Sequence, residues 1–465
     1  MSATLLCGHV LDVLPTLPEK SVHCVVCSPP FYGLRRYPVD PVTWPDGRTG
    51  YLGAETTPDL FVSHLVMVFD AARRVMRDDA TLWVNLGSSY AGSGGPGSQY
   101  DNKATRGNKG EFQKFQNVNK NVPSFKPLDL IGIPWMFAFA MQRNGWYLRS
   151  AITWCKHNVM PESVNGWRWE QHRVKVEKQP SGDDNKIGTL GQGDVGSFNS
   201  DEGRAPWSDC PGCANCLPNG GLILRKGNWR PTKATEMIFM FSKTDSYYSD
   251  KEAVLVPLAE SSITRNQSGW DGNEDRDYMV GKQNNMSRWL GSDDCKNQTG
   301  RNLWDYWLMS TKPLHESHFA AYPPELVKKC VLASTSAKGV CPKCGGQWAR
   351  VLNKTGEKIC APDAYGRPRV YQSSGNSEQQ KGGGKGSMGF FTNVTEMSGW
   401  RPTCRCPAAD PIPAVVLDPF VGSGTTCIVA AGLGRNSIGI DASAEYIAMS
   451  HRRLGLLVEE EKSKS

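Results

Sequence analysis

Short apolar runs alternate along this chain with segments in which apolar residues recur at helical spacing. The runs with the length and composition of buried strands are Val22–Cys27, Ala80–Asn85, Tyr147–Trp154, Ala234–Phe241, Ala414–Asp418 and Ser437–Asp441. The segments with helical spacing are Asp59–Met76, Ile133–Arg143, Phe319–Leu332 and the two stretches that follow the last two strands. Strands and helices in alternation predict an α/β fold, with a mixed, mostly parallel sheet that carries helices on both faces.

The composition fits a soluble globular protein. Hydrophobic residues make up 39% of the chain and charged residues 21%. No apolar run is long enough to cross a bilayer, and Met1–His9 lacks the basic and apolar regions of a signal peptide. We therefore expect a cytoplasmic protein with no membrane partner. The net charge of +7 permits a polyanionic partner without demanding one.

A glycine-rich turn follows the strand predicted near the C-terminus. It reads Asp418-Pro-Phe-Val-Gly-Ser-Gly-Thr-Thr426, in which Gly422 and Gly424 let the backbone turn sharply and approach a ligand closely. Thr425 opens the next helix, whose N-terminal N–H groups favour an anion. Asp441 ends the following strand, at the interval of about 20 residues at which a carboxylate reaches ribose hydroxyls in dinucleotide folds. Such a turn suits S-adenosylmethionine, NAD or a flavin, and also simple tight packing.

A second stiff turn, Ser28-Pro-Pro-Phe31, follows the first predicted strand. Its two prolines fix φ and remove N–H donors, so backbone carbonyls project from it. The Ser28 hydroxyl and the Pro29 carbonyl can accept hydrogen bonds from an exocyclic amine and localise its lone pair on nitrogen. Phe31 can stack on the plane of a base. By itself such a turn is more often only a rigid strand end with a core phenylalanine.

Taken together, the two turns resemble those of the DNA amino-methyltransferases, in the β arrangement in which the catalytic motif precedes the cofactor motif. Residues 318–326 are similar to the family element that lines the methionine end of the cofactor, and 154–161 and 231–236 to strand ends around its target-base pocket. The resemblance covers 1–165, 230–255 and 300–455. It implies a Rossmann-like methyltransferase fold with circularly permuted motif order. The residues it assigns to the cofactor S-adenosylmethionine are Asp418, Phe420, Gly422, Gly424, Thr425, Asp441, His318 and Pro323.

The resemblance also implies the reaction. A base of double-stranded DNA flips into the pocket, and the methyl group passes directly from the sulfonium to its amine. The implied catalytic residues are Ser28, Pro29, Pro30 and Phe31. Tetrads led by serine are typical of N4-cytosine enzymes, which favours cytosine over the alternative, adenine N6. The family further implies a bacterial or phage-infected host cell, and a homodimer and a companion restriction endonuclease as possible partners.

Two other functions stay open at this point. One is a methyltransferase for a protein glutamine or an RNA base, although such enzymes usually carry Asn first and the cofactor motif ahead of the tetrad. The other is a non-enzymatic, zinc-containing DNA-binding protein, which would be expected to show decay in the tetrad or the glycines. This chain has Ser28 first and its cofactor motif after the tetrad, and both the tetrad and the glycines are intact.

Two residues near the N-terminus need separate comment. Family members usually carry Gly-Asp before the tetrad, with the Asp near the cofactor adenine. Here the pair is Gly8-His9, and whether the nearby Asp12 substitutes is open. Cys27 precedes the tetrad on a strand predicted to be buried, so we expect a core thiol rather than a nucleophile.

The spacing of seven of the 15 cysteines indicates metal binding rather than disulfides. Cys341, Cys344, Cys404 and Cys406 form a plausible four-thiolate zinc site, which leaves no open position for catalysis. Cys210, Cys213 and Cys216 form a second set with three thiols. Its fourth ligand could be His172 or Cys295, and the sequence does not decide between them.

Basic segments lie between these motifs. The lysine-rich loop between residues 91 and 127 could close over DNA phosphates or be a solvated insertion. Residues 167–175 mix aromatic and basic side chains, and with residues 265–301 they are assigned to sequence recognition. The predicted division is the following: 1–165, catalytic half with the mobile loop 91–127; 166–230, Cys-bearing recognition segment; 231–255, return to the sheet; 256–303, recognition segment; 304–337, helix before the cofactor motif; 338–410, zinc-ribbon-like insertion; 411–465, cofactor-binding half.

Overall fold

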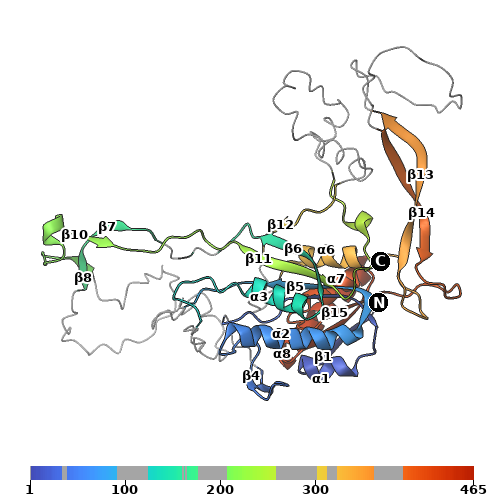
Figure 1. The fold of residues 1–465 in the computed structure, drawn as a ribbon, viewed down its shortest axis with the longest axis horizontal. Coiled ribbons are helices and arrows are strands. Elements are labelled where there is room, and N and C mark those ends of the chain that lie inside the picture. Colours follow the sequence, from blue (N-terminus) through green and yellow to red (C-terminus); the bar gives the residue numbers. More distant parts are fainter. Residues whose placement is uncertain are drawn as a thin grey trace, which may run out of the picture. The chain divides into compact units, whose positions relative to one another are not determined.

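A computed structural model describes residues 2–33, 39–91, 124–159, 162, 165–175, 207–257, 301–311, 322–360 and 391–464 of the chain. These residues belong to two units, Met1–Asn158 with Thr235–Ser465, and Val159–Ala234. Most of the predicted mobile loop 91–127 falls outside the described residues, as do His318, Cys295 and nearly all of the basic segment 265–301. The first unit contains the predicted sheet (Figure 1).

That sheet has eight strands, of which seven run in the same direction and one runs the opposite way. In spatial order they are β1 (Ala3–Cys7), β16 (Asn436–Asp441), β15 (Val415–Asp418), β2 (Val22–Cys27), β5 (Met76–Leu86), β11 (Thr235–Ser242), β6 (Tyr147–Cys155) and β12 (Tyr306–Leu308). Strand β11 runs antiparallel to both β5 and β6. The predicted α/β class with a mostly parallel sheet is confirmed. The short strands β1 and β12 were not among the predicted elements.

The last two strands of the chain lie inside the sheet, between its first two strands. β15 pairs with β2 on one side and with β16 on the other, and β16 pairs with β1. The sheet is therefore complete only when the two ends of the sequence are interleaved.

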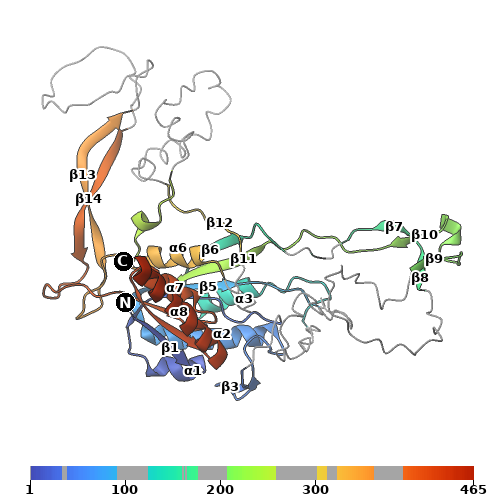
Figure 2. The ribbon, with the colours of Figure 1, turned by 180° about the vertical axis from the view of Figure 1, so that it is seen from behind.

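Strand β2 is buried along its whole length because helices cover both faces of the sheet. Val25 and Cys27 pack in a cluster with α2 (Pro58–Val75) and α3 (Ile133–Arg143). Cys24 and Val26 point to the other face and pack in a cluster with α6 (Pro324–Ser334) and α7 (Thr425–Gly432). Helix α8 (Ala444–Lys464) contacts α7, β1 and β16 (Figure 2).

Local sequence explains where these helices begin. Helix α2 starts at Pro58, after Thr57 caps it by accepting a hydrogen bond from the Leu60 N–H at 3.2 Å. The helix predicted over 319–332 was expected to open at Pro323-Pro324, and α6 begins at Pro324 after an extended Pro323 (ψ 141°); residues 319–321 lie outside the described residues. A residue that precedes proline avoids helical backbone angles. No helix within the described ranges is both long and apolar enough to cross a bilayer.

The remaining elements are short or form separate hairpins. In the first unit they are α1 (Val10–Val13), β3 (Val42–Thr43), β4 (Thr49–Gly50), β13 (Trp348–Cys360) and β14 (Phe391–Pro402). In the second unit they are β7 (Arg168–Gln171), β8 (Arg173–Lys175), β9 (Trp207–Asp209) and β10 (Leu222–Arg225). The second unit has two antiparallel ribbons, β7 with β10 and β8 with β9.

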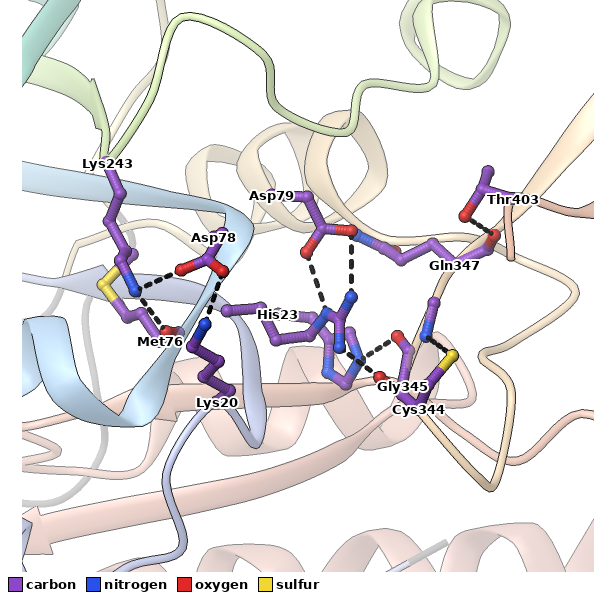
Figure 3. A network of polar contacts seen from close by, with 12 residues as sticks. Lys20, His23, Met76, Asp78, Asp79, Lys243, Cys344, Gly345, Gln347 and Thr403 are labelled. Carbon is purple, nitrogen blue, oxygen red and sulfur yellow. Dashed lines mark hydrogen bonds and ion pairs between the residues drawn. The ribbon is translucent and has the colours of Figure 1, made fainter. Parts of the chain in front are cut away.

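The turn that holds Cys344 is fastened to the starting ends of the sheet strands (Figure 3). His23, near the start of β2, has its Nε2 3.0 Å from the Gly345 carbonyl oxygen, and its Nδ1 accepts the Val415 N–H at 3.1 Å. Arg77 donates to the Cys344 carbonyl and is held by Asp79 at 2.8 Å. The imidazole is therefore neutral with the proton on Nε2, since Nδ1 must remain an acceptor.

Burial of this imidazole gives a pH-dependent stability. Desolvation lowers the pKa of His23 from 6.5 to about 4. Between these values the folded protein binds fewer protons than the unfolded chain, so stability is lost as the pH falls from 6.5 through 4. The difference between these two pKa values corresponds to about 3 kcal/mol of unfolding free energy. His23→Gln keeps one donor and one acceptor but cannot take up a proton.

We expect urea denaturation of His23→Gln, followed between pH 7 and pH 4, to show a shallower loss of unfolding free energy than in the unmodified protein. Acid release of any thiolate-bound metal is common to both proteins and cancels in the comparison. His157→Gln, at an exposed histidine, is the control and keeps the full loss. Equal slopes for His23→Gln and the unmodified protein would show that His23 is not the group responsible.

Candidate active site

The two turns singled out in the sequence meet at one edge of the sheet. β2 and β15 are adjacent parallel strands, with Val416 paired to Cys24 and Leu417 to Val25. Because adjacent parallel strands end on the same side of the sheet, Ser28 and Asp418 lie at neighbouring strand ends on that edge. Thr426 adds a direct link, since its hydroxyl oxygen lies 3.3 Å from the Val26 carbonyl oxygen, across 400 residues of sequence.

A hydrogen-bond chain orients the hydroxyl of Ser28. Its Oγ donates to Oδ1 of Asn85 at 3.1 Å, and the Asn85 amide nitrogen donates to the Met237 carbonyl in β11 at 3.3 Å. Asn85 is 3% exposed, so its amide has no competing water. Because the hydroxyl proton is used on Asn85, the lone pairs of Ser28 remain for a donor on the other side. Sequence reasoning missed Asn85 as a site residue, although it ends a predicted strand.

Glycine on two neighbouring segments lets Phe31 take its position. A Cβ at Gly87 would lie 2.7 Å from Cε2 of the Phe31 ring, so only glycine fits beneath the ring. A Cβ at Gly53, where φ is +91°, would lie 3.1 Å from the Phe31 carbonyl oxygen. The Gly53 carbonyl also accepts the Gly33 N–H at 2.8 Å. Phe31 is thus approached by glycine backbone from two segments.

The carboxylate of Asp418 lies beneath the glycine-rich turn and is 1% exposed. It accepts hydrogen bonds from the Phe420 N–H at 3.0 Å, the Thr426 hydroxyl at 2.6 Å and the Tyr322 hydroxyl at 2.9 Å. Burial raises its pKa to about 6, although these three donors oppose the rise. Asp418 therefore organises the turn and ties it to Tyr322, which lies two residues before α6. Neither Tyr322 nor Thr426 was among the predicted site residues.

The neighbouring strand ends in Asp441, which holds the outer part of the same turn. Its carboxylate accepts the Gly422 N–H and the Ser443 N–H, each at 2.9 Å, and burial raises its pKa. Gly422 and Gly424 both have positive φ, +51° and +82°. A Cβ at Gly424 would lie 2.9 Å from the Ser450 hydroxyl oxygen. Both glycines are therefore required by the backbone of the turn.

The other predicted cofactor residues fall at the same edge where they are described. Thr425 is buried at the first position of α7, and Phe420 is half-buried against the core. Pro323 precedes α6, next to Tyr322. Cys27 lies in the core, and burial raises the pKa of its thiol well above the usual value, which is unsuited to a nucleophile.

Comparison with known proteins identifies the family. A family model of N6 and N4 DNA methylases matches residues 22–341 and 412–452, which is more than half of the chain. The chain belongs to this family of DNA methylases. The match passes over residues 342–411, where three of the four cysteines of one predicted zinc site lie.

Characterised relatives of this DNA methylase are type II methyltransferases. M.Cfr9I of Citrobacter freundii is 31% identical over 334 residues, which are 72% of this chain and 73% of that protein. M.XycI of Xanthomonas campestris pv. cyanopsidis is 29% identical over 453 residues, 97% of this chain and 87% of the relative. Among solved structures, the cytosine-N4-specific PvuII DNA methyltransferase aligns over 97% of this chain and 86% of that chain, with 13% identity and a TM-score of 0.41. The last likeness is too low to decide the substrate.

The departure at His9 places an imidazole one residue after Gly8, which is hydrogen-bonded to the end of β16. The N–H of the preceding Gly8 donates to the Asp441 carbonyl at 2.9 Å. The ring of His9 meets Trp44 edge-on at 5.3 Å, and Trp44 stacks on His64 at 4.0 Å. Desolvation lowers the pKa of His9, with Asp12 opposing. A neutral aromatic surface thus stands where most of the family is expected to carry a carboxylate.

Both predicted cysteine sets are gathered in space. The ligand atoms of Cys341, Cys344, Cys404 and Cys406 all lie within 4.8 Å of one another, as do those of His172, Cys210, Cys213 and Cys216. Within the first set, N–H groups of Cys344 and Lys343 lower the pKa of the Cys341 thiol to about 7, whereas the hydrogen bond with Cys344 raises the pKa of Cys406 to about 12. Cys341 is therefore the first thiol of the set to ionise. For the second set, the structure places His172 beside the three thiols.

We expect Tyr322→Phe to destabilise the first unit by about 1–3 kcal/mol, because a buried carboxylate loses one of its donors. The loss should grow as the pH rises through about 6, where Asp418 becomes ionised. Urea denaturation at pH 5 and pH 8 measures both effects. Tyr147→Phe, at a half-exposed tyrosine, is the control and should change little. A Tyr322→Phe loss that is the same at both pH values would contradict the role given to Asp418.

Proposed function

We propose that this DNA methylase transfers a methyl group from S-adenosylmethionine to the N4 amine of a cytosine flipped out of double-stranded DNA. The observation that carries the proposal is the pairing of β2 with β15, which sets the Ser28–Phe31 turn beside the 418–426 turn. A cofactor held by one turn and a base held by the other would face each other without any further rearrangement of the sheet.

The residues of the 418–426 turn fit the cofactor. Gly422 and Gly424 offer backbone without side chains, Phe420 offers an aromatic surface, and α7 begins at Thr425 with its N–H groups toward the turn. Asp441 ends the neighbouring strand, as expected of a carboxylate near a ribose. Asp418 contributes indirectly, through the hydrogen bonds that fix the turn. When bound, the cofactor supplies an electrophilic methyl group on a sulfonium sulfur.

The residues of the tetrad fit an amine that must act as a nucleophile. Ser28 keeps its lone pairs for an amine N–H because its own proton is engaged by Asn85. The Pro29 carbonyl is a second acceptor on a backbone with few alternative conformations. Two N–H···O bonds to fixed acceptors draw the nitrogen lone pair out of conjugation with the ring, and Phe31 stacks on the base. Catalysis is then mostly positioning of nitrogen and methyl carbon in line.

The leading serine favours cytosine over adenine. Serine presents a hydroxyl oxygen as the first acceptor, whereas the N6-adenine tetrads of this family usually begin with Asp or Asn. A homodimer and a companion restriction endonuclease stay predictions from the family resemblance.

We expect Ser28→Ala to reduce methyl transfer by about 10²-fold, the effect of removing one fixed hydrogen-bonding group from a transition state. S-adenosylmethionine affinity, measured by calorimetry, should change less than about twofold because Ser28 lies in the other turn. Ser63→Ala, at an exposed position of α2, is the matched control.

Mass spectrometry of nucleosides from DNA methylated by the unmodified protein should show N4-methylcytosine. Detection of N6-methyladenine instead would refute the choice of base. The absence of both products, on DNA substrates of varied sequence, would refute the proposed reaction.

We also propose that Cys341, Cys344, Cys404 and Cys406 bind one zinc ion with a structural role. Four thiolates fill a tetrahedral zinc site and leave no position for substrate. The turn that carries Cys341 and Cys344 is fastened to His23 and Arg77 at the sheet. The ion would therefore stabilise the start of β2 and β5 rather than take part in methyl transfer.

Cys404→Ser should lose one equivalent of zinc per chain, measured by elemental analysis after gel filtration. Its midpoint of thermal unfolding should also fall, since the turn at Cys344 is no longer held. Cys7→Ser, at an exposed free thiol outside both sets, should keep the full zinc content. Unchanged zinc in Cys404→Ser would rule this site out.

A further inference from the structure

The ligand set of the Val159–Ala234 unit lies where its two ribbons join. His172 is the single residue between β7 and β8, which belong to different ribbons, and Cys210 directly follows β9. Backbone hydrogen bonds close the junction: Cys210 N–H to the His172 carbonyl at 2.8 Å, and His172 N–H to the Gly221 carbonyl at 2.9 Å. One bound ion would thus fix both ribbons at a single point.

The spacing of the ligand atoms fits tetrahedral zinc. The Sγ atoms of Cys213 and Cys216 are 3.7 Å apart, and Nδ1 of His172 is 3.4 Å from Sγ of Cys213. Ordinary zinc bond lengths at tetrahedral angles place two thiolates about 3.8 Å apart and an imidazole nitrogen about 3.6 Å from a thiolate. The coordination proposed here is therefore three thiolates and one imidazole.

This unit needs such an ion because its described residues form almost no apolar core. Cys216 is the one buried hydrophobic residue among them, and it belongs to the ligand set. The described residues of the unit therefore supply little of the burial that normally offsets the entropy of folding. Metal coordination supplies folding free energy directly in small domains of this kind.

Aromatic side chains that would otherwise build a core are instead on the surface. Trp167, Trp169, Trp207 and Trp229 are 66%, 52%, 50% and 70% exposed. Lys226 places its ammonium group 4.9 Å from the ring centre of Trp167. Exposed aromatic rings next to cations are the combination with which proteins stack on bases and neutralise phosphates.

The β7–β10 ribbon also carries an excess of positive charge. Arg168 and Arg225 are directly paired across the strands, and both contact the single carboxylate of Glu170, Arg225 through Nε at 3.4 Å. Like charges opposite one another destabilise a ribbon unless an anion compensates them. A two-stranded ribbon is also an element that the major groove of DNA admits.

We propose that a zinc ion held by His172, Cys210, Cys213 and Cys216 orders this unit into a DNA-contact module, whose exposed tryptophans and paired arginines bind duplex DNA. The inference rests on the proposed function, because the duplex is the methylase's substrate. A second copy of the chain fits this surface less well than DNA does. A symmetric contact through the ribbon would place the arginine pair of one copy against the same pair of the other.

The first test separates the metal from the fold. His172→Ala should lose one zinc per chain, and its kcat/KM for DNA methylation should fall at least tenfold, while S-adenosylmethionine affinity stays within about twofold. His172→Cys supplies a fourth thiolate in place of the imidazole, so this variant should keep both zinc and kcat/KM. Full kcat/KM in His172→Ala with one zinc missing would overturn the role of the metal.

The second test keeps the metal and changes the surface. A double variant Trp167→Ala and Trp169→Ala should retain zinc but bind duplex DNA about tenfold or more weakly in a fluorescence anisotropy titration, because apolar contacts with base edges and the ring beside Lys226 are lost. The matched variant Trp167→Phe and Trp169→Phe keeps aromatic rings and should bind within about threefold of the unmodified protein. Unchanged DNA affinity in the alanine variant, or a changed oligomeric state with unchanged DNA affinity, would overturn the proposed surface.

These results are distinguishable from failure of the proposed function. If the unmodified protein binds S-adenosylmethionine and duplex DNA but transfers no methyl group to any DNA, the reaction is wrong. The anisotropy titrations then still decide whether the zinc-ordered unit binds DNA.

Discussion

The parallel pairing of β15 with β2 is the contact on which the rest of this molecule depends. It places two turns from opposite ends of the sequence on one edge of the sheet. The hydroxyl of Thr426 reinforces the pairing, because it reaches both the Val26 carbonyl and the buried Asp418 carboxylate. Each turn is then stiffened by its own means: prolines and surrounding glycine backbone at Phe31, and buried carboxylates at the glycine-rich turn. Buried side chains therefore hold both turns in place: Asn85 at Ser28, and Asp418 with Thr426 at the glycine-rich turn.

Much of this arrangement follows from local sequence. The strand Val22–Cys27 and the helix Ile133–Arg143 were predicted with their observed limits, since apolar runs and helical spacing report burial directly. The adjacency of the two turns could be anticipated only through the family resemblance. The short edge strand Ala3–Cys7 escaped prediction because only two of its five residues are partly buried and none is fully buried.

Long-range partners of single polar side chains were not predictable. Nothing in the neighbourhood of Asn85 indicates that its amide bridges Ser28 and Met237, since that contact depends on the order of strands in the sheet. Tyr322 reaches Asp418 across 96 residues for the same reason. His172 was one of two candidate ligands, and it lies beside the thiols because two ribbons meet at its position. In each case the deciding information is topological rather than local.

The interleaving of the chain ends has a consequence for biosynthesis. While the polypeptide emerges from the ribosome, β2 can pair with β5 on one side, but its other edge has no partner until β15 has been translated. At ordinary elongation rates that delay is roughly 20–80 s, during which an apolar strand edge is open to wrong pairing. Chaperone binding to the nascent chain during this interval would therefore raise the yield of folded protein.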